Sequence, residues 1–263
     1  MSVLAAGSTA WLVAHEMRLM WRDGSKAGRA VRIGALLFLL LVPIVGGVGL
    51  AFTLRDAADV PAGALGYAAA GWWGLVVLML SGASLHVLRV FHDRGDLDLL
   101  LAAPVPPARV LAAKSVAVQL TVALPMLVVS TPFVIVSALL GHPGWLGGTA
   151  MVVIAAVIAT AGAFLGAGAL FRHFGSRRAR MIVQIAGGVF GVTVGVGGQA
   201  ANFAPETFAA VTRWLSAAPP PPFDAPALAV FGAPLPLLAF VALAGVAASL
   251  SARLAADQLQ AGR

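Results

Sequence analysis

The chain has 263 residues, of which 60% are hydrophobic and only 10% are charged. Soluble domains carry about 25% charged residues, so this chain has too few to cover the surface of a soluble globule. Its apolar residues form continuous blocks of about twenty, the length that crosses a hydrocarbon core of about 30 Å. They do not form the ~10-residue alternating segments of a membrane β-barrel. The absence of cysteine excludes disulfides and thiolate metal sites.

The first 32 residues predict a cytoplasmic or interfacial lead-in. Within it, residues 8–21 form a pattern typical of an amphipathic helix that lies in the membrane interface. A cytoplasmic helix that packs beneath the membrane domain is the alternative interpretation. A signal peptide is not favoured, because no positive charge precedes the apolar residues, which His15, Glu16 and Arg18 interrupt.

The apolar blocks predict an all-α fold, a polytopic membrane helix bundle whose membrane domain covers residues 33–252. Prolines inside the blocks are expected to kink their helices locally, because neighbouring helices can satisfy the freed carbonyl groups. An external loop is expected over residues 200–234, with a short helix from Pro205 to Leu215. The six predicted spans are Ile33–Leu54, Leu65–Leu88, Ser115–Leu140, Gly148–Phe171, Met181–Gln199 and Leu235–Ala252.

The lysines and arginines predict the orientation of these spans. All 17 of them except Arg55 and Arg213 fall on one side of the predicted membrane domain. By the positive-inside rule this side is cytoplasmic, together with both termini and the tail of residues 253–263. The formal net charge of +7 then follows from topology, and a nucleic-acid partner is not expected.

Glycines recur at four-residue spacing in two of the predicted spans. Gly187, Gly191 and Gly195 share one face of the fifth span, and Gly162 and Gly166 share one face of the fourth. Such faces allow helix backbones to approach closely in a membrane. They predict helix packing or dimerisation and carry no information about a substrate.

The spans contain no Asp, Glu, Lys or Arg. Ion-coupled transporters and pumps usually need such groups for their relays. The chain also has no G-x-x-x-x-G-K-[ST] motif, so it has no nucleotide site of that type. If the protein moves a solute, the energy is expected from another subunit, and no enzymatic activity or cofactor is expected in this chain.

The most informative segment is the predicted cytoplasmic loop over residues 89–114. Gly95 is expected to end the helix that continues from the second span, and Asp96 can cap a new short helix. That helix is expected to stop before Pro104, and Pro107 is expected to start the next one. The result is a short helix with an apolar face outside the membrane. It can pack under its own bundle, lie on lipid, or insert into a groove on a partner.

This loop resembles the cytoplasmic segment of ABC-2-type transporter permeases, with the approximate pattern R-G-[DE]-[LF]-x-x-L-L-x-[SA]-P-[LV]-P. A lead-in at 15–32 and the stretch 222–236 are also similar, so the resemblance covers nearly the whole chain. Some relatives carry twelve spans, so this chain would need a second copy or a paralogue. The matching loop residues are Arg94, Gly95, Asp96, Leu97, Asp98, Leu99, Leu100, Leu101, Pro104 and Pro106.

The resemblance implies the permease subunit of an exporter in a bacterial cytoplasmic (inner) membrane, surrounded by membrane lipid. It implies that the loop docks on a separate ABC ATPase subunit, present in two copies, which binds ATP and Mg²⁺. It also implies a second permease half. The alternative hypothesis is a non-transporting membrane scaffold or assembly factor, which predicts no associated ATPase. The transported substrate is not predicted.

Overall fold

The computed structural model describes residues 62–92, 107–217 and 219–261, together with positions 11, 13–14, 41, 44–49, 51–52, 55 and 60. Every regular element among these residues is a helix, which confirms the predicted all-α class. Most of the predicted lead-in and of the cytoplasmic loop lies outside the described residues. In chain order the elements are α3 (Ala62–His92), α5 (Pro107–Leu139), the 3₁₀-helix η1 (Pro143–Leu146), α6 (Gly147–Gly198), α7 (Ala200–Phe203), α8 (Pro205–Ser216), α9 (Ala225–Val230) and α10 (Pro234–Ala261).

Within the described part of the chain, four segments are long and apolar enough to cross a membrane, as an integral membrane protein requires. They match the second, third, fourth and sixth predicted spans. α5 continues through Pro125 and Pro132, so both prolines are accommodated within one helix. The four segments are Gly63–Leu88, Ala112–Leu139, Pro143–Leu170 and Pro234–Arg253.

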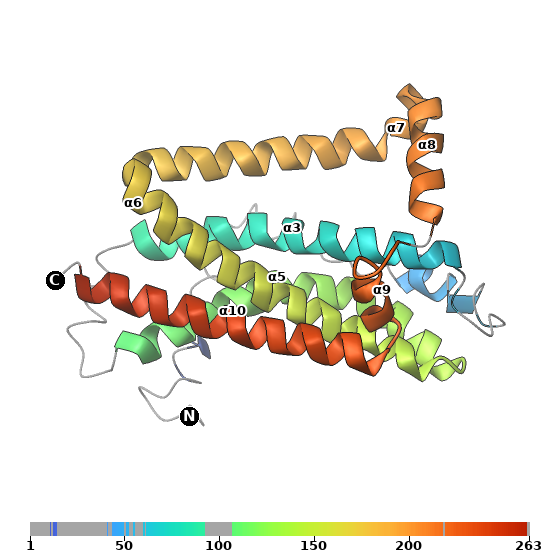
Figure 1. The fold of residues 1–263 in the computed structure, drawn as a ribbon, viewed down its shortest axis with the longest axis horizontal. Helices are drawn as coiled ribbons and strands as arrows, with labels where there is room; N and C mark the ends of the chain where they lie inside the picture. Colours follow the sequence, from blue (N-terminus) through green and yellow to red (C-terminus); the bar gives the residue numbers. More distant parts are fainter. Residues whose placement is uncertain are drawn as a thin grey trace.

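The fourth and fifth predicted spans are two arms of a single element, α6. The chain reverses at Gly175, whose φ of 71° and ψ of 168° lie in a region essentially reserved for glycine. Figure 1 shows the second arm returning above α3. Its apolar segment, Met181–Thr193, is shorter than a full span. Of the first predicted span, positions 44–49 and 51–52 are helical, and most of the remainder lies outside the described residues.

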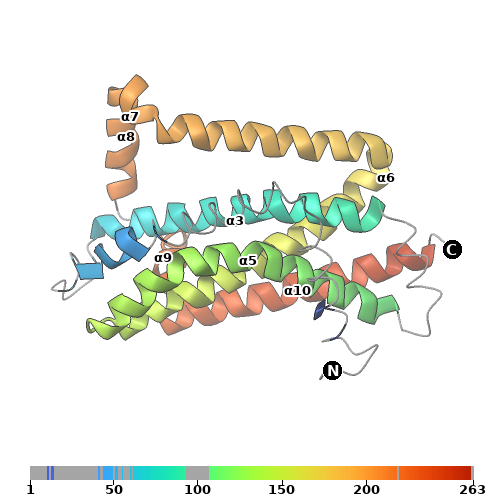
Figure 2. The same ribbon diagram turned by 180° about the vertical axis from the view of Figure 1, so that it is seen from behind.

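The long helices alternate in direction, so their ends gather at two opposite ends of the bundle (Figures 1 and 2). The end of α3, the start of α5, the bend of α6 and the end of α10 lie together. We call this the basic end, because the chain there carries Arg109, Lys114, Arg178 and Arg253.

The opposite end, which we call the far end, contains η1, α7, α8, α9 and the starts of α3 and α10 (Figure 1). Arg55 and Arg213, the two cations that the sequence places on the other side of the membrane domain, are found here. Arg213 belongs to α8, and the carbonyl oxygen of Arg55 lies 3.3 Å from His142 Nε2, in the turn before η1. The described lysines and arginines are therefore segregated between the two ends as the charge pattern predicted.

The core surrounds the first arm of α6, against which α3, α5 and α10 pack. On α3 the buried side chains recur every three or four residues, as expected for one helix face. On the first arm of α6 small alanines recur every fourth residue, which allows close helix approach. The core includes Trp72, Val76, Met79, Ala83 and Val87 of α3, Val118 and Val122 of α5, and Ala155, Ala159, Ala163 and Ala167 of α6.

Candidate functional site

The predicted ATPase-coupling residues, 94–106, lie outside the described residues, but the structure describes both flanks. α3 ends at His92 and α5 begins at Pro107, and both helix ends lie at the basic end (Figure 2). Just beyond the start of α5, the predicted loop already enters the packed bundle, because its residues Val110, Ala113 and Lys114 are buried. The segment 93–106 therefore connects two packed helices at the end that carries most of the cations.

The predicted helix-packing glycines meet the rest of the chain in different ways. A Cβ atom at Gly162 would lie 3.4 Å from Leu80 Cδ1, and one at Gly187 would lie 3.1 Å from Ser81 Oγ. α3 thus passes between the two arms of α6. Cβ atoms at Gly166 and Gly191 would have no neighbour within 4 Å among the described residues, and the surroundings of Gly195 are not described.

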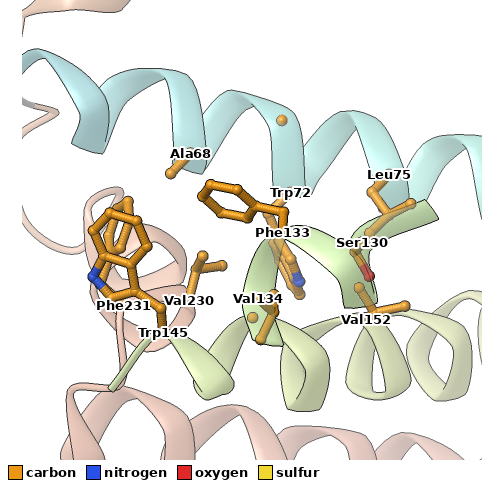
Figure 3. Close-up of a pocket in the computed structure, with 12 residues that line it drawn as sticks. Ala68, Trp72, Leu75, Ser130, Phe133, Val134, Trp145, Val152, Val230 and Phe231 are labelled. Atoms are coloured by element: carbon orange, nitrogen blue, oxygen red, sulfur yellow. The ribbon is translucent and has the colours of Figure 1, made fainter. Parts of the chain in front are cut away.

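A cavity of about 210 Å³ lies at the far end of the bundle, between α3, α5, the start of α6 and α9 (Figure 3). Its wall is almost entirely apolar. Four aromatic side chains from four different segments border it: Trp72, Phe133, Trp145 and Phe231.

Two tryptophans fix the shape of this cavity. The indole N–H of Trp72 donates a hydrogen bond of 3.1 Å to the carbonyl oxygen of Met151, so its ring is tied to the first arm of α6. Trp145, in η1, stacks on His142 with ring centroids 4.7 Å apart. It also meets the ring of Phe231 edge-on at 5.4 Å. These contacts join η1 to the turn between α9 and α10.

The same two segments touch backbone to backbone. A Cβ atom at Gly144 would lie 2.9 Å from the carbonyl oxygen of Phe231, and one at Gly147 would lie 2.5 Å from that of Ala229. A Cβ atom at Gly232, whose φ is +89°, would overlap the carbonyl group of Gly144. Glycine at these positions lets Trp145 and Phe231 meet at the edge of the cavity.

The cavity offers almost no polar chemistry. Ser130 is the polar side chain in its described wall (Figure 3), and its hydroxyl oxygen is buried with no hydrogen-bond partner among the described residues. No acid, base or cation is among those wall residues. Engineered apolar cavities of about 150 Å³ stay dry and bind small hydrocarbons. This cavity is partly open, and its apolar wall can likewise hold an apolar group.

Sequence reasoning missed this cavity because its residues come from segments far apart in the chain. Each aromatic residue alone is ordinary for a membrane helix or its ends. Across the described residues, no group of three His, Asp or Glu side chains is placed to hold a metal ion. Comparison with known protein families, with curated proteins and with solved structures finds no match to this chain.

Proposed function

We propose that the chain is the permease subunit of an ABC-2-type exporter, which forms the membrane path of a transporter driven by a separate ATPase. The observation that carries the proposal is the segment Arg94–Pro106. Its sequence resembles the ATPase-docking loop of that family. The structure adds that this segment connects α3 and α5 at the basic end.

The composition of the spans supports an external energy source. Their lack of acidic and basic residues leaves no groups for an ion relay. In the proposed complex, two ATPase subunits bind ATP and Mg²⁺ and dock on the loop. Their closure moves two permease halves relative to each other and changes access to the path between them.

The proposed topology has six spans, with both termini and the basic end in the cytoplasm of a bacterium. The segregation of the described cations supports this orientation, because loops rich in Lys and Arg stay on the cytoplasmic side. The far end, with Arg55 and Arg213, then faces outward.

A second permease half, either another copy or a paralogue, completes the proposed transporter. The second arm of α6 supports this part of the proposal. Its apolar side chains are largely exposed, with Ile185 58%, Val189 61% and Val192 66% exposed. An apolar helix at the side of a membrane bundle contacts either lipid or another membrane helix.

Co-purification tests the function directly. The tagged chain, extracted from its native membrane in a mild detergent, is expected to retain a polypeptide with a G-x-x-x-x-G-K-[ST] motif and ATPase activity. A matched extraction of an unrelated tagged membrane protein is the control. A complex with other membrane proteins but no ATPase, found also after crosslinking in intact cells, would favour the scaffold hypothesis.

The orientation makes its own prediction. Because the chain has no cysteine, the variants His173→Cys, beside the α6 bend, and Ala209→Cys, in α8, each carry a single thiol at an exposed position. A membrane-impermeant maleimide is expected to label Ala209→Cys in intact spheroplasts and His173→Cys only after permeabilisation. Labelling of His173→Cys from outside would contradict the proposed topology.

A further inference from the structure

Helix α8, at the far end, is amphipathic. Phe208, Val211 and Leu215 follow one another at spacings of three and four residues, so they share one helix face. Glu206 and Arg213, seven residues apart, lie on the opposite face. No residue of α8 is buried, and Phe208 and Val211 are 41% and 47% exposed. The described chain therefore covers the apolar face of α8 only in part.

α8 lies crosswise to the long helices. Figures 1 and 2 both show it across the far end of the bundle, between the tip of the second arm of α6 and the start of α3. Helix α3 is long and apolar enough to cross a membrane. A helix that lies crosswise at the end of such a helix runs along the surface of the bilayer.

Two contacts hold α8 in this orientation. The Tyr67 hydroxyl donates a hydrogen bond of 3.2 Å to the carbonyl oxygen of Thr212. One turn further along α8, the carbonyl oxygen of Leu215 occupies the space that a side chain at Gly66 would need. α8 is thus fixed at its carboxyl end to the first turns of α3, near the point where that helix leaves the membrane.

The exposed apolar surface of the second α6 arm continues into this region. Val192 and Val196, near the end of that arm, are 66% and 62% exposed, and Phe203 of α7 is 80% exposed. Trp214 of α8 is 75% exposed. Exposed aromatic side chains at the end of an apolar membrane helix are typical of the headgroup layer, where tryptophan in particular is enriched.

A second copy of the chain is a poorer occupant of this face. Stable protein interfaces bury about 800 Å² per partner. Even a fully buried phenylalanine contributes only about 150–250 Å², and the apolar face of α8 offers one phenylalanine, one valine and one half-buried leucine. A lipid surface needs no such area, because the transmembrane helices already hold the protein in place.

We propose that α8 is an interfacial helix that lies in the headgroup layer at the far end. Phe208, Val211 and Leu215 contact acyl chains, while Glu206 and Arg213 face water. This arrangement is that of amphipathic helices in the interface plane, whose apolar side sits about 5–10 Å below the headgroups. The proposal concerns lipid contact alone and does not depend on the proposed transport function.

Single-cysteine variants carrying a nitroxide label test this placement in the full chain, reconstituted in phosphatidylcholine vesicles. Phe208→Cys and Val211→Cys report on the apolar face, and Ala209→Cys and Arg213→Cys are the matched controls on the polar face. The apolar-face labels are expected to collide more with dissolved oxygen and less with a water-soluble nickel chelate. The polar-face labels are expected to show the reverse.

Two results would overturn the proposal. Equal nickel accessibility at all four positions would place α8 in water, away from the bilayer. Protection of the Phe208→Cys and Val211→Cys labels from both reagents, with broadening that increases with protein density, would place this face against a second copy. An unchanged melting temperature of each labelled variant verifies that the label itself leaves the fold intact.

Discussion

Replacement of Leu100 by aspartate is expected to abolish association with the ATPase and, with it, ATP-driven transport. In the helix predicted over Asp96–Ala103, Leu97, Leu100 and Leu101 share the apolar face. A carboxylate buried in that contact without a partner costs about 3 to 5 kcal/mol. This corresponds to an increase on the order of a hundredfold to several thousandfold in the dissociation constant.

Ala102→Asp provides the matched control, because it adds the same charge to the same predicted helix on the opposite face. We expect this variant to recover the ATPase at the wild-type level in a pull-down from detergent-solubilised membranes. Both variants are expected to insert normally, since the loop lies outside the spans. Equal ATPase recovery with Leu100→Asp and wild type would refute docking through this loop. Equal loss with both variants would refute the predicted face.

Gly232→Ala is expected to cause a large loss of stability at the far end, for two separate reasons. Its φ of +89° is unfavourable for alanine by about 1–2 kcal/mol. The new methyl group would also overlap the carbonyl group of Gly144, and such overpacking typically costs a further ~1–3 kcal/mol. The expected sum is about 2–5 kcal/mol, measured as a lower melting temperature in detergent micelles.

Gly141→Ala separates the two causes. Gly141 also has a positive φ, +107°, but a Cβ atom there has no described neighbour within 4 Å. The free energy of unfolding of Gly141→Ala is expected to fall only by the cost of the positive φ, about 1–2 kcal/mol. If both variants melt at the same temperature, the close approach of η1 to the turn between α9 and α10 does not contribute to stability.

The hydropathy pattern predicted the positions of most of the long helices. The helices at 62–92 and 234–261 contain their predicted apolar spans, and the helix at 107–139 contains all of its span except Leu140. The helices extend beyond the spans by up to nine residues. The extensions at 89–92, 107–114 and 253–261 include charged residues, because a helix can continue past the hydrocarbon core into the interface, where an apolar block no longer marks it. The short helix from Pro205 was also predicted correctly, since proline and an acidic residue in its first turn are strong local signals.

Contacts between distant segments could not be predicted. The spans predicted to end at Phe171 and to begin at Met181 leave 172–180 between them, whereas the structure is helical on both sides of Gly175. At Gly232 and Gly147 a backbone atom of another segment occupies the space of a Cβ atom, whereas at Gly166 no described atom lies within 4 Å of that position. The local sequence does not distinguish these two kinds of glycine. The aromatic cavity depends on the same long-range packing. The proposed docking segment, 94–106, lies outside the described residues, so its role stays a prediction.

The reversal at Gly175 sets the direction of the second arm of α6. That arm covers 176–198 and is about 34 Å long at 1.5 Å per residue. Because one residue joins the two arms, its two torsions form the pivot that sets the direction of the whole arm. A rotation of about 10° at this pivot moves the tip by about 6 Å. The contacts of Gly187 and of α8 with α3 hold the arm in its present direction, so the backbone at Gly175 determines where α7 and α8 lie at the far end.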